Sequence, residues 1–136
     1  MEHIDIAMAA DARYAQHATV AMASILLRAA HPERIRFYLL ADQLPADIES
    51  RVRASIERHG AAVDVIPLSP AKLAGLYTSG QLSRTAYARL QAAELLPRTV
   101  QRLLYLDCDI LAHDDIEKLW KMNLDGHPVG AVKDFG

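Results

Sequence analysis

The feature that most restricts the fold of this chain is the alternation of short apolar runs with longer segments of helical pattern. The apolar runs predict strands at 3–10, 35–41, 61–68, 103–111 and 128–135. The segments between them predict helices at 17–30, 44–60, 85–97 and 116–120. The segment 69–83 mixes turn residues with a short helical possibility, and we expect a loop there. Strands that alternate with helices are typical of a mostly parallel sheet with helices on both faces. We therefore expect an α/β fold in a single domain over 1–136.

Two of the predicted helices should pack differently. The segment 44–60 has apolar side chains at every fourth position, namely Ile48, Val52 and Ile56. Charged side chains fill the opposite side, so one face should be buried, and Gly60 stands where a left-handed residue commonly follows a helix. The segment 17–30 is apolar on most sides, so we expect a mostly buried helix there.

Composition argues against several classes of protein. The chain carries 15 Lys and Arg against 17 Asp and Glu, and its net charge of -2 gives no electrostatic reason to expect nucleic acid as a partner. The single cysteine, Cys108, cannot form an internal disulfide, which favours a reducing compartment. No apolar run reaches the roughly 18 residues of a transmembrane helix, and the N-terminus lacks the basic region of a signal peptide. We expect a cytoplasmic protein, and contact with the inner face of a membrane stays open.

Two carboxylates interrupt the apolar run 103–111. Asp107 and Asp109 flank Cys108 there, and burial of an unpaired carboxylate costs on the order of several kcal/mol. Alternate side chains of an extended segment point to the same side, so both could bind one hard cation, Mg²⁺ or Mn²⁺, together with phosphate oxygens and water. The alternative is a solvated turn, which is the commoner meaning of Asp-x-Asp alone. The flanking aliphatic residues favour the metal site.

The loop after the first predicted strand carries a second candidate, since ligands of open α/β sheets bind beyond the carboxyl ends of the strands. It contains Asp11 and Tyr14 but none of the glycines that a dinucleotide or phosphate-binding loop requires. Asp11 can accept a hydrogen bond from a base N–H or a ribose hydroxyl, and Tyr14 can stack on a base. The alternative is a helix-capping role for Asp11 and a packing role for Tyr14, and the residues alone do not decide between the two.

Other chemical groups have simpler interpretations. Asp114 and Asp115 precede the predicted helix 116–120 at the spacing of N-terminal caps. The six histidines show no metal-binding spacing, and we assign them to the surface or to core packing. The neighbouring carboxylates should raise the pKa of the Cys108 thiol, which disfavours a nucleophilic role. No serine lies in a nucleophile elbow, so acyl transfer lacks support.

Four sequence segments together resemble a known enzyme family. They are, in order, IDIAMAADARYAQHATVAMASIL, IRFYLLAD, SRTAYARLQAAELLP and LLYLDCDILAHDDIEKLW. They closely resemble glycosyltransferase family 8, which includes bacterial lipopolysaccharide glucosyl- and galactosyltransferases and glycogenin. The resemblance implies a Rossmann-like GT-A fold and a retaining enzyme that moves glucose or galactose from a UDP-sugar donor to a hydroxyl of a glycan or glycolipid acceptor, as in lipopolysaccharide synthesis. It also implies a bound Mn²⁺ or Mg²⁺ ion.

The resemblance further implies roles for particular residues. Asp107 and Asp109 match the family's Asp-x-Asp metal ligands. The donor nucleotide and sugar would be contacted by Ala9, Asp11, Tyr14, Arg89, Cys108 and Asp134. Within that set, the backbone of Cys108 would meet the ribose, Tyr14 the uracil ring, and Arg89 the donor sugar and phosphates. No catalytic residue is implied.

The chain departs from the family pattern at two places. Arg13 stands where relatives often carry Asn, and the family's third metal ligand, a histidine in a later segment, has no counterpart before Gly136. We therefore expect the N-terminal, nucleotide-binding part of a longer enzyme, which would bind UDP weakly and turn over slowly on its own. Two alternatives stay open. One is a haloacid-dehalogenase-like phosphohydrolase, whose Asp-x-Asp also follows an apolar strand; the other is a non-catalytic fragment that associates with itself through an open sheet edge.

Overall fold

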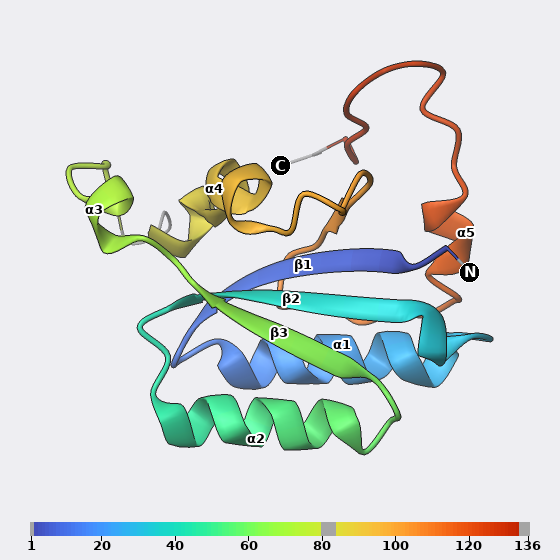
Figure 1. Ribbon diagram of the computed structural model, residues 1–136, viewed down its shortest axis with the longest axis horizontal. Coiled ribbons are helices and arrows are strands. Elements are labelled where there is room, and N and C mark those ends of the chain that lie inside the picture. The colour runs from blue at the N-terminus through green and yellow to red at the C-terminus, as the bar shows by residue number, and fades with distance from the viewer. Residues whose placement is uncertain (1, 80–83, 134–136) are drawn as a thin grey trace.

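The computed structural model describes residues 2–79 and 84–133, and within them four parallel strands form one sheet in the order β3-β2-β1-β4 (Figure 1). The strands are β1 Ile4–Asp11, β2 Ile35–Asp42, β3 Ala62–Pro67 and β4 Leu104–Tyr105. The helices are α1 Ala15–Arg28, α2 Ala46–Glu57, α3 Pro70–Leu73, α4 Ala88–Leu95 and α5 Glu117–Trp120. Two short 3₁₀ helices are η1 Pro32–Arg34 and η2 Arg84–Tyr87.

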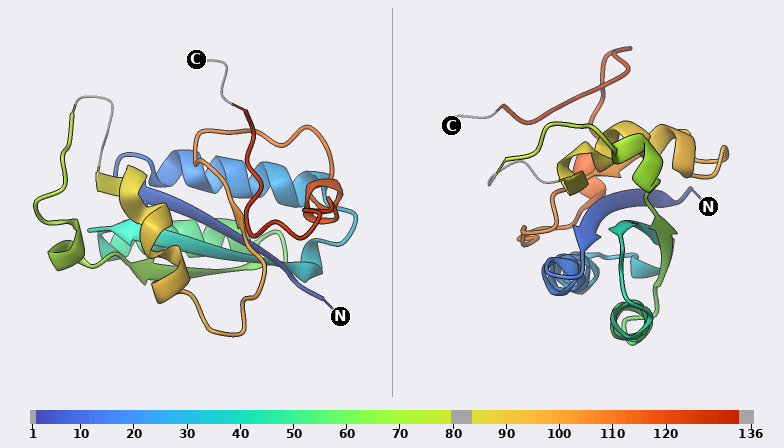
Figure 2. Two further views of the ribbon diagram at one scale, coloured as in Figure 1. Left: turned by 90° about the horizontal axis from the view of Figure 1, so that it is seen from above. Right: turned by 90° about the vertical axis from the view of Figure 1, so that its left-hand side faces the viewer.

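The sheet separates two hydrophobic layers. Helices α1 and α2 lie side by side on one face, and α4 covers the other (Figures 1 and 2). Side chains alternate along β1, so Ile6 and Met8 pack with α1 and α2, whereas Ala7 and Ala9 pack with α4. The predicted α/β fold, with a parallel sheet and helices on both faces, is confirmed.

The elements up to the end of β3 follow the predicted pattern with one exception. The predicted face of α2 packs on the sheet through Ile48, Val52 and Ile56. Gly60 has a φ of +76°, as expected for a residue that follows a helix. The exception is α1, which buries one face rather than most of its sides: Val20 is 51% exposed and Leu27 is 72% exposed. No helix in the described part of the chain is long and apolar enough to cross a membrane.

Two predictions for the later part of the chain are wrong, and the short helical possibility within the expected loop 69–83 is a single turn, α3. The strand predicted at 103–111 shrinks to the two residues of β4, which pair only with Ile6 and Ala7 of β1. No strand forms over 128–133, whose residues are exposed, and the remainder of that prediction lies outside the described residues. β1 runs on to Asp11, but the chain after β4 turns at Cys108 and Asp109, so the pairing stops early.

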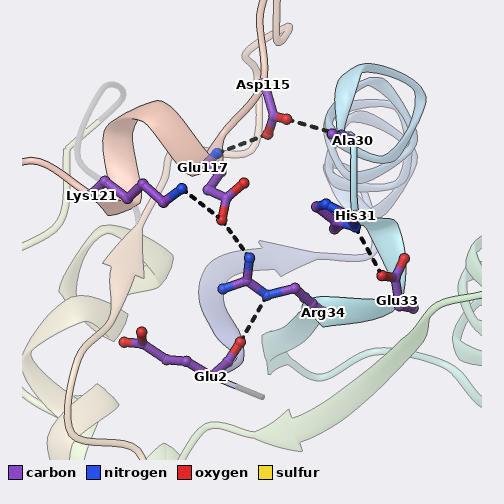
Figure 3. A network of polar contacts seen from close by, with 8 residues as sticks. All are labelled: Glu2, Ala30, His31, Glu33, Arg34, Asp115, Glu117 and Lys121. Atoms are coloured by element: carbon purple, nitrogen blue, oxygen red, sulfur yellow. Dashed lines mark hydrogen bonds and ion pairs between the residues drawn. The ribbon is translucent and has the colours of Figure 1, made fainter.

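A network of polar contacts holds α5 at the amino-terminal ends of the strands (Figure 3). Arg34 lies at the centre: its Nε donates to the carbonyl oxygen of Glu2 at 3.0 Å, and its guanidinium pairs with Glu117. Lys121 approaches the same carboxylate at 3.2 Å. Hydrogen bonds from Arg34 and then from Lys121 lower the pKa of Glu117. The network therefore joins the segment after β4 to the start of β2.

A second contact of this network caps α5. The carboxylate of Asp115 accepts hydrogen bonds from the backbone N–H groups of Glu117 and Ala30, each at 2.9 Å (Figure 3). These two bonds lower the pKa of Asp115. Asp114 instead accepts from the Lys118 ammonium at 2.5 Å. The predicted capping role is confirmed for Asp115, which also fixes the end of α1.

Candidate functional site

β4 is the parallel neighbour of β1, so its carboxyl end lies against the middle of β1 and the chain beyond it runs toward the edge of the sheet where β1 ends. Ala7 pairs with Tyr105, and the N–H of Leu106 donates to the carbonyl oxygen of Ala7 at 3.0 Å. The chain leaves the two strands at Asp11 and Asp107. Both candidate segments therefore emerge at the edge of the sheet where a ligand is expected.

The loop after β1 is organised by Asp11. Its Oδ1 accepts hydrogen bonds from the N–H groups of Arg13 at 2.9 Å and Tyr14 at 3.0 Å, so it stabilises the turn that leads into α1. Tyr14 is 45% exposed, and its ring centroid lies 5.2 Å from that of His17. The capping interpretation thus fits Asp11, whereas the packing interpretation does not fit Tyr14. The side chain of Ala9 is buried with α4, so only its backbone is left to meet a ligand.

The two carboxylates beyond β4 lie in water rather than in a buried strand. Cys108 and Asp109 form a turn, so the argument from extended geometry does not apply. Asp107 and Asp109 are both exposed, and Cys108 is half-buried between them. Burial chiefly raises the pKa of the Cys108 thiol, and the negative charges of Asp109, Asp107 and Asp11 raise it further. The effect of Asp11 shows that the two candidate segments lie within electrostatic reach of one another.

Arg89, on the first turn of α4, faces the turn that carries these carboxylates. Its Nη2 lies 4.0 Å from Oδ1 of Asp107, and its guanidinium lies 5.5 Å from the centre of the Tyr105 ring. Both charged side chains are more than half exposed, at 57% and 69%, so the pair is weak. The Arg89 guanidinium nevertheless lies close to one of the two predicted metal ligands, Asp107.

The residues present fit a divalent cation only in part. Carboxylate oxygens are the ligands that Mg²⁺ and Mn²⁺ prefer, and Asp107 and Asp109 supply them in an open position. Within 2–79 and 84–133, no three His, Cys, Asp or Glu side chains come together as a metal site. An ion held here would need further ligands, such as phosphate oxygens and water. The predicted contact Asp134 lies outside the described residues.

An open hollow of about 360 Å³ adjoins Asp11 at the carboxyl ends of β1 and β2. Its lining is entirely polar and consists of Asp11, Asp42, Gln43, Thr78, Ser79, Arg84 and Thr85. Neither Asp42 nor Arg84 was predicted as a site residue. Asp42 could have been found by the rule that identified Asp11, because it ends the second strand in the same way. Arg84 lies in the segment SRTAYARLQAAELLP that resembles the family, but no spacing along the chain indicates its contact with Asp42.

Comparisons with known proteins identify the family of the chain. Residues 5–136 match glycosyl transferase family 8. The chain belongs to glycosyltransferase family 8. The lipopolysaccharide 1,2-glucosyltransferase of Escherichia coli (strain K12) is 32% identical to this family 8 chain over 133 residues, 98% of this chain and 39% of that protein. General stress protein A of Bacillus subtilis (strain 168) is 25% identical over 136 residues, 99% of this chain and 48% of that protein.

The family 8 fold is also found among solved structures. The crystal structure of galactosyltransferase LgtC in complex with donor and acceptor sugar analogues matches with a TM-score of 0.78 and 33% identity, over 89% of this chain and 43% of that one. The fold is therefore GT-A, as in LgtC, and family 8 membership rules out the phosphohydrolase alternative. The chain spans less than half the length of the relatives it matches, at 39%, 48% and 43%.

Proposed function

We propose that this chain is the nucleotide-sugar-binding part of a retaining glycosyltransferase that moves glucose or galactose from a UDP-sugar to a hydroxyl of a glycan or glycolipid. One observation carries the proposal. The Asp11 to Tyr14 loop, the turn that holds Asp107 and Asp109, and the Arg89 guanidinium meet at one edge of the sheet. Membership of family 8 supports a common ligand for these groups.

Each group has a chemical task in this proposal. The exposed ring of Tyr14 stacks on the uracil, and the free oxygen of Asp11 accepts a hydrogen bond from the base. The backbone of Ala9 and Cys108 meets the ribose. Arg89 donates to the diphosphate and donor sugar, because a guanidinium binds phosphate oxygens in a fixed fork.

Asp107 and Asp109 are the residues that would hold Mn²⁺ or Mg²⁺. A bound divalent ion supplies positive charge that stabilises a departing diphosphate. The two carboxylates can orient such an ion because both belong to the short segment around the turn that follows β4. Their exposure keeps them accessible to a ligand that brings its own phosphate oxygens.

The cellular setting belongs to the proposal as well. The lone cysteine and the absence of an apolar run of membrane-spanning length support action in the cytoplasm. The similarity to the lipopolysaccharide 1,2-glucosyltransferase of Escherichia coli supports a surface glycan such as lipopolysaccharide as the end product. A glycolipid acceptor would bring the enzyme to the inner face of a membrane.

Calorimetric titration of the 136-residue chain with UDP and Mn²⁺ tests the proposal. We expect a binding heat that requires the metal and that disappears in the double variant Asp107→Asn/Asp109→Asn. A matched control, Asp47→Asn/Asp64→Asn, makes the same change of charge at exposed positions on α2 and β3. It should bind as the wild type does. Equal heats from all three proteins would contradict the metal site.

A further inference from the structure

The hollow beside Asp11 contains a charge pair that the proposed nucleotide contacts do not use. Asp42 accepts a hydrogen bond from Nη2 of Arg84 at 3.1 Å, and the Asp42 side chain is only 16% exposed. Asp11 and Asp42 are partners in the register of β1 and β2, so their backbones lie about one strand spacing, roughly 4.8 Å, apart, and both side chains line the hollow together with Arg84. A guanidinium is thus fixed next to a residue that is expected to meet a nucleobase.

Arg84 also has a donor that lacks a partner. Its Nε is buried and finds no hydrogen bond among the described residues. A buried N–H without a partner is unfavourable, because it has lost its hydration without a replacement. A carbonyl oxygen placed in the hollow would allow the guanidinium to turn toward it while the bond to Asp42 is kept.

We propose that Arg84, positioned by Asp42, selects the base of the bound nucleotide by donating to a ring carbonyl. The carboxylate of Asp11 only accepts hydrogen bonds and the guanidinium of Arg84 only donates them. Side by side, they match a base edge on which an N–H stands next to a C=O. The inference rests on the proposed function, because it takes the nucleobase to lie against Asp11.

Uracil and cytosine differ at this edge. Uracil offers its N3–H to Asp11 and its O4 to Arg84, so both contacts are satisfied. Cytosine presents a bare N3 to the acceptor and an amino group to the donor, so both contacts fail. A site that leaves its own buried polar groups unpaired rejects a ligand more strongly than one that only loses a favourable contact. The pair therefore selects uridine over cytidine nucleotides.

Calorimetric titration with UDP and with CDP in the presence of Mn²⁺ measures this selection as the ratio of two dissociation constants. We expect the wild type to bind UDP more tightly than CDP. The variant Arg84→Met should lower the ratio about tenfold, the value of one hydrogen bond to a charged group, mainly by weakening UDP binding. Asp42→Asn should lower the ratio less, because Arg84 remains but is no longer anchored.

The control is Arg51→Met, which removes an exposed arginine from α2 and should leave the ratio unchanged. A ratio that stays at the wild-type value in Arg84→Met overturns the inference, and so does an equal weakening of UDP and CDP, which would mark a purely structural role. In both cases the proposed function would still be supported if the wild type binds UDP only in the presence of the metal. If the wild type binds neither nucleotide, both proposals fail. Should Arg84→Met not fold, Asp42→Asn, which conserves side-chain size, decides.

Discussion

The part of the molecule that contains β1 to β3 and the part that follows residue 100 are built in different ways. In the first, β1 pairs with β2 from Ile4 to Asp11, and β2 pairs with β3 over most of its length. In the second, β4 has two residues and α5 has four. Large apolar side chains are exposed there: Leu111 is 62% exposed, Val129 75% and Val132 91%.

The candidate site combines both parts. The regular part supplies Asp11 and Tyr14 on a loop fixed by β1 and α1, and the irregular part supplies the carboxylates of Asp107 and Asp109. The irregular part is held by a short pairing with β1, by the contacts of α5, by half-buried side chains such as Leu106 and Ile110 that pack on the core, and by a hydrogen bond from the N–H of Ala112 to Oγ of Ser24 at 3.0 Å. We infer that the position of the carboxylates depends on these contacts, while the position of Asp11 depends on the pairing of β1 with β2.

The largest effect is expected in the regular part. Phe37, in β2, is 1% exposed, and Phe37→Ala should lower the free energy of unfolding by about 3–5 kcal/mol, through lost burial and the cavity left behind. The matched change in the irregular part, Leu111→Ala, should cost less than about 0.5 kcal/mol, because that side chain is already in water. Urea unfolding followed by circular dichroism measures both. Similar losses for the two variants would abolish the contrast.

The same contrast explains which elements could be predicted from the sequence. In the regular part each apolar run has a partner along its length, so periodicity alone indicates the strand and the predicted face of α2. In the irregular part, local pattern is insufficient. The run 103–111 is as apolar as the others. It pairs with β1 over only two residues, and the chain then turns at Cys108.

From the sequence, only those residues of the candidate site could be predicted that stand at a recognisable position, such as the end of an apolar run. Asp11, Asp107 and Asp109 follow apolar runs, so their placement at one sheet edge could be inferred. Arg89 was expected near the donor sugar and phosphates from the family resemblance rather than from periodicity, and its approach to Asp107 appears only in the structure. The pair of Asp42 and Arg84 joins residues distant in sequence, and only tertiary packing brings them together.

The next largest effect should follow from release of α5. Trp120 is the single tryptophan of the chain, is 4% exposed, and has the Arg102 guanidinium 5.3 Å from its ring. Its fluorescence therefore reports the irregular part, and circular dichroism reports mainly the regular part. Arg34→Met removes the centre of the network in Figure 3. We expect the urea midpoint from fluorescence to fall more than the midpoint from circular dichroism.

A control for this prediction is again Arg51→Met, which should move neither midpoint. If both midpoints fall together in Arg34→Met, the two parts unfold as one cooperative unit. The carboxylates of the site would then be held as firmly as the core itself.

A smaller effect is expected from acid. Hydrogen bonds hold the pKa values of Asp115 and Glu117 below their usual 3.8 and 4.5, so the unfolded chain binds protons more readily than the folded one. Their contribution to stability is therefore complete above about these usual values and is lost as pH falls through the lowered ones. The fluorescence midpoint should fall from pH 7 to pH 3 in the wild type. Asp115→Asn should reduce that fall, whereas Asp64→Asn should not; an unchanged dependence in Asp115→Asn would contradict the role of the cap.

The smallest effect tests the turn that carries the carboxylates. Burial, and then the charge of Asp109, raises the pKa of the Cys108 thiol above its usual 9.0, so alkylation by iodoacetamide should still accelerate above pH 9. Because Cys108 is the single cysteine, the measured rate has one source. Asp109→Asn removes a repelling charge, lowers the pKa and should raise the rate at pH 8 by about two- to threefold, whereas Asp64→Asn should leave it unchanged. A rate that levels off below pH 9 would mean that the thiol is solvated and that the turn packs even more loosely than the rest of the irregular part.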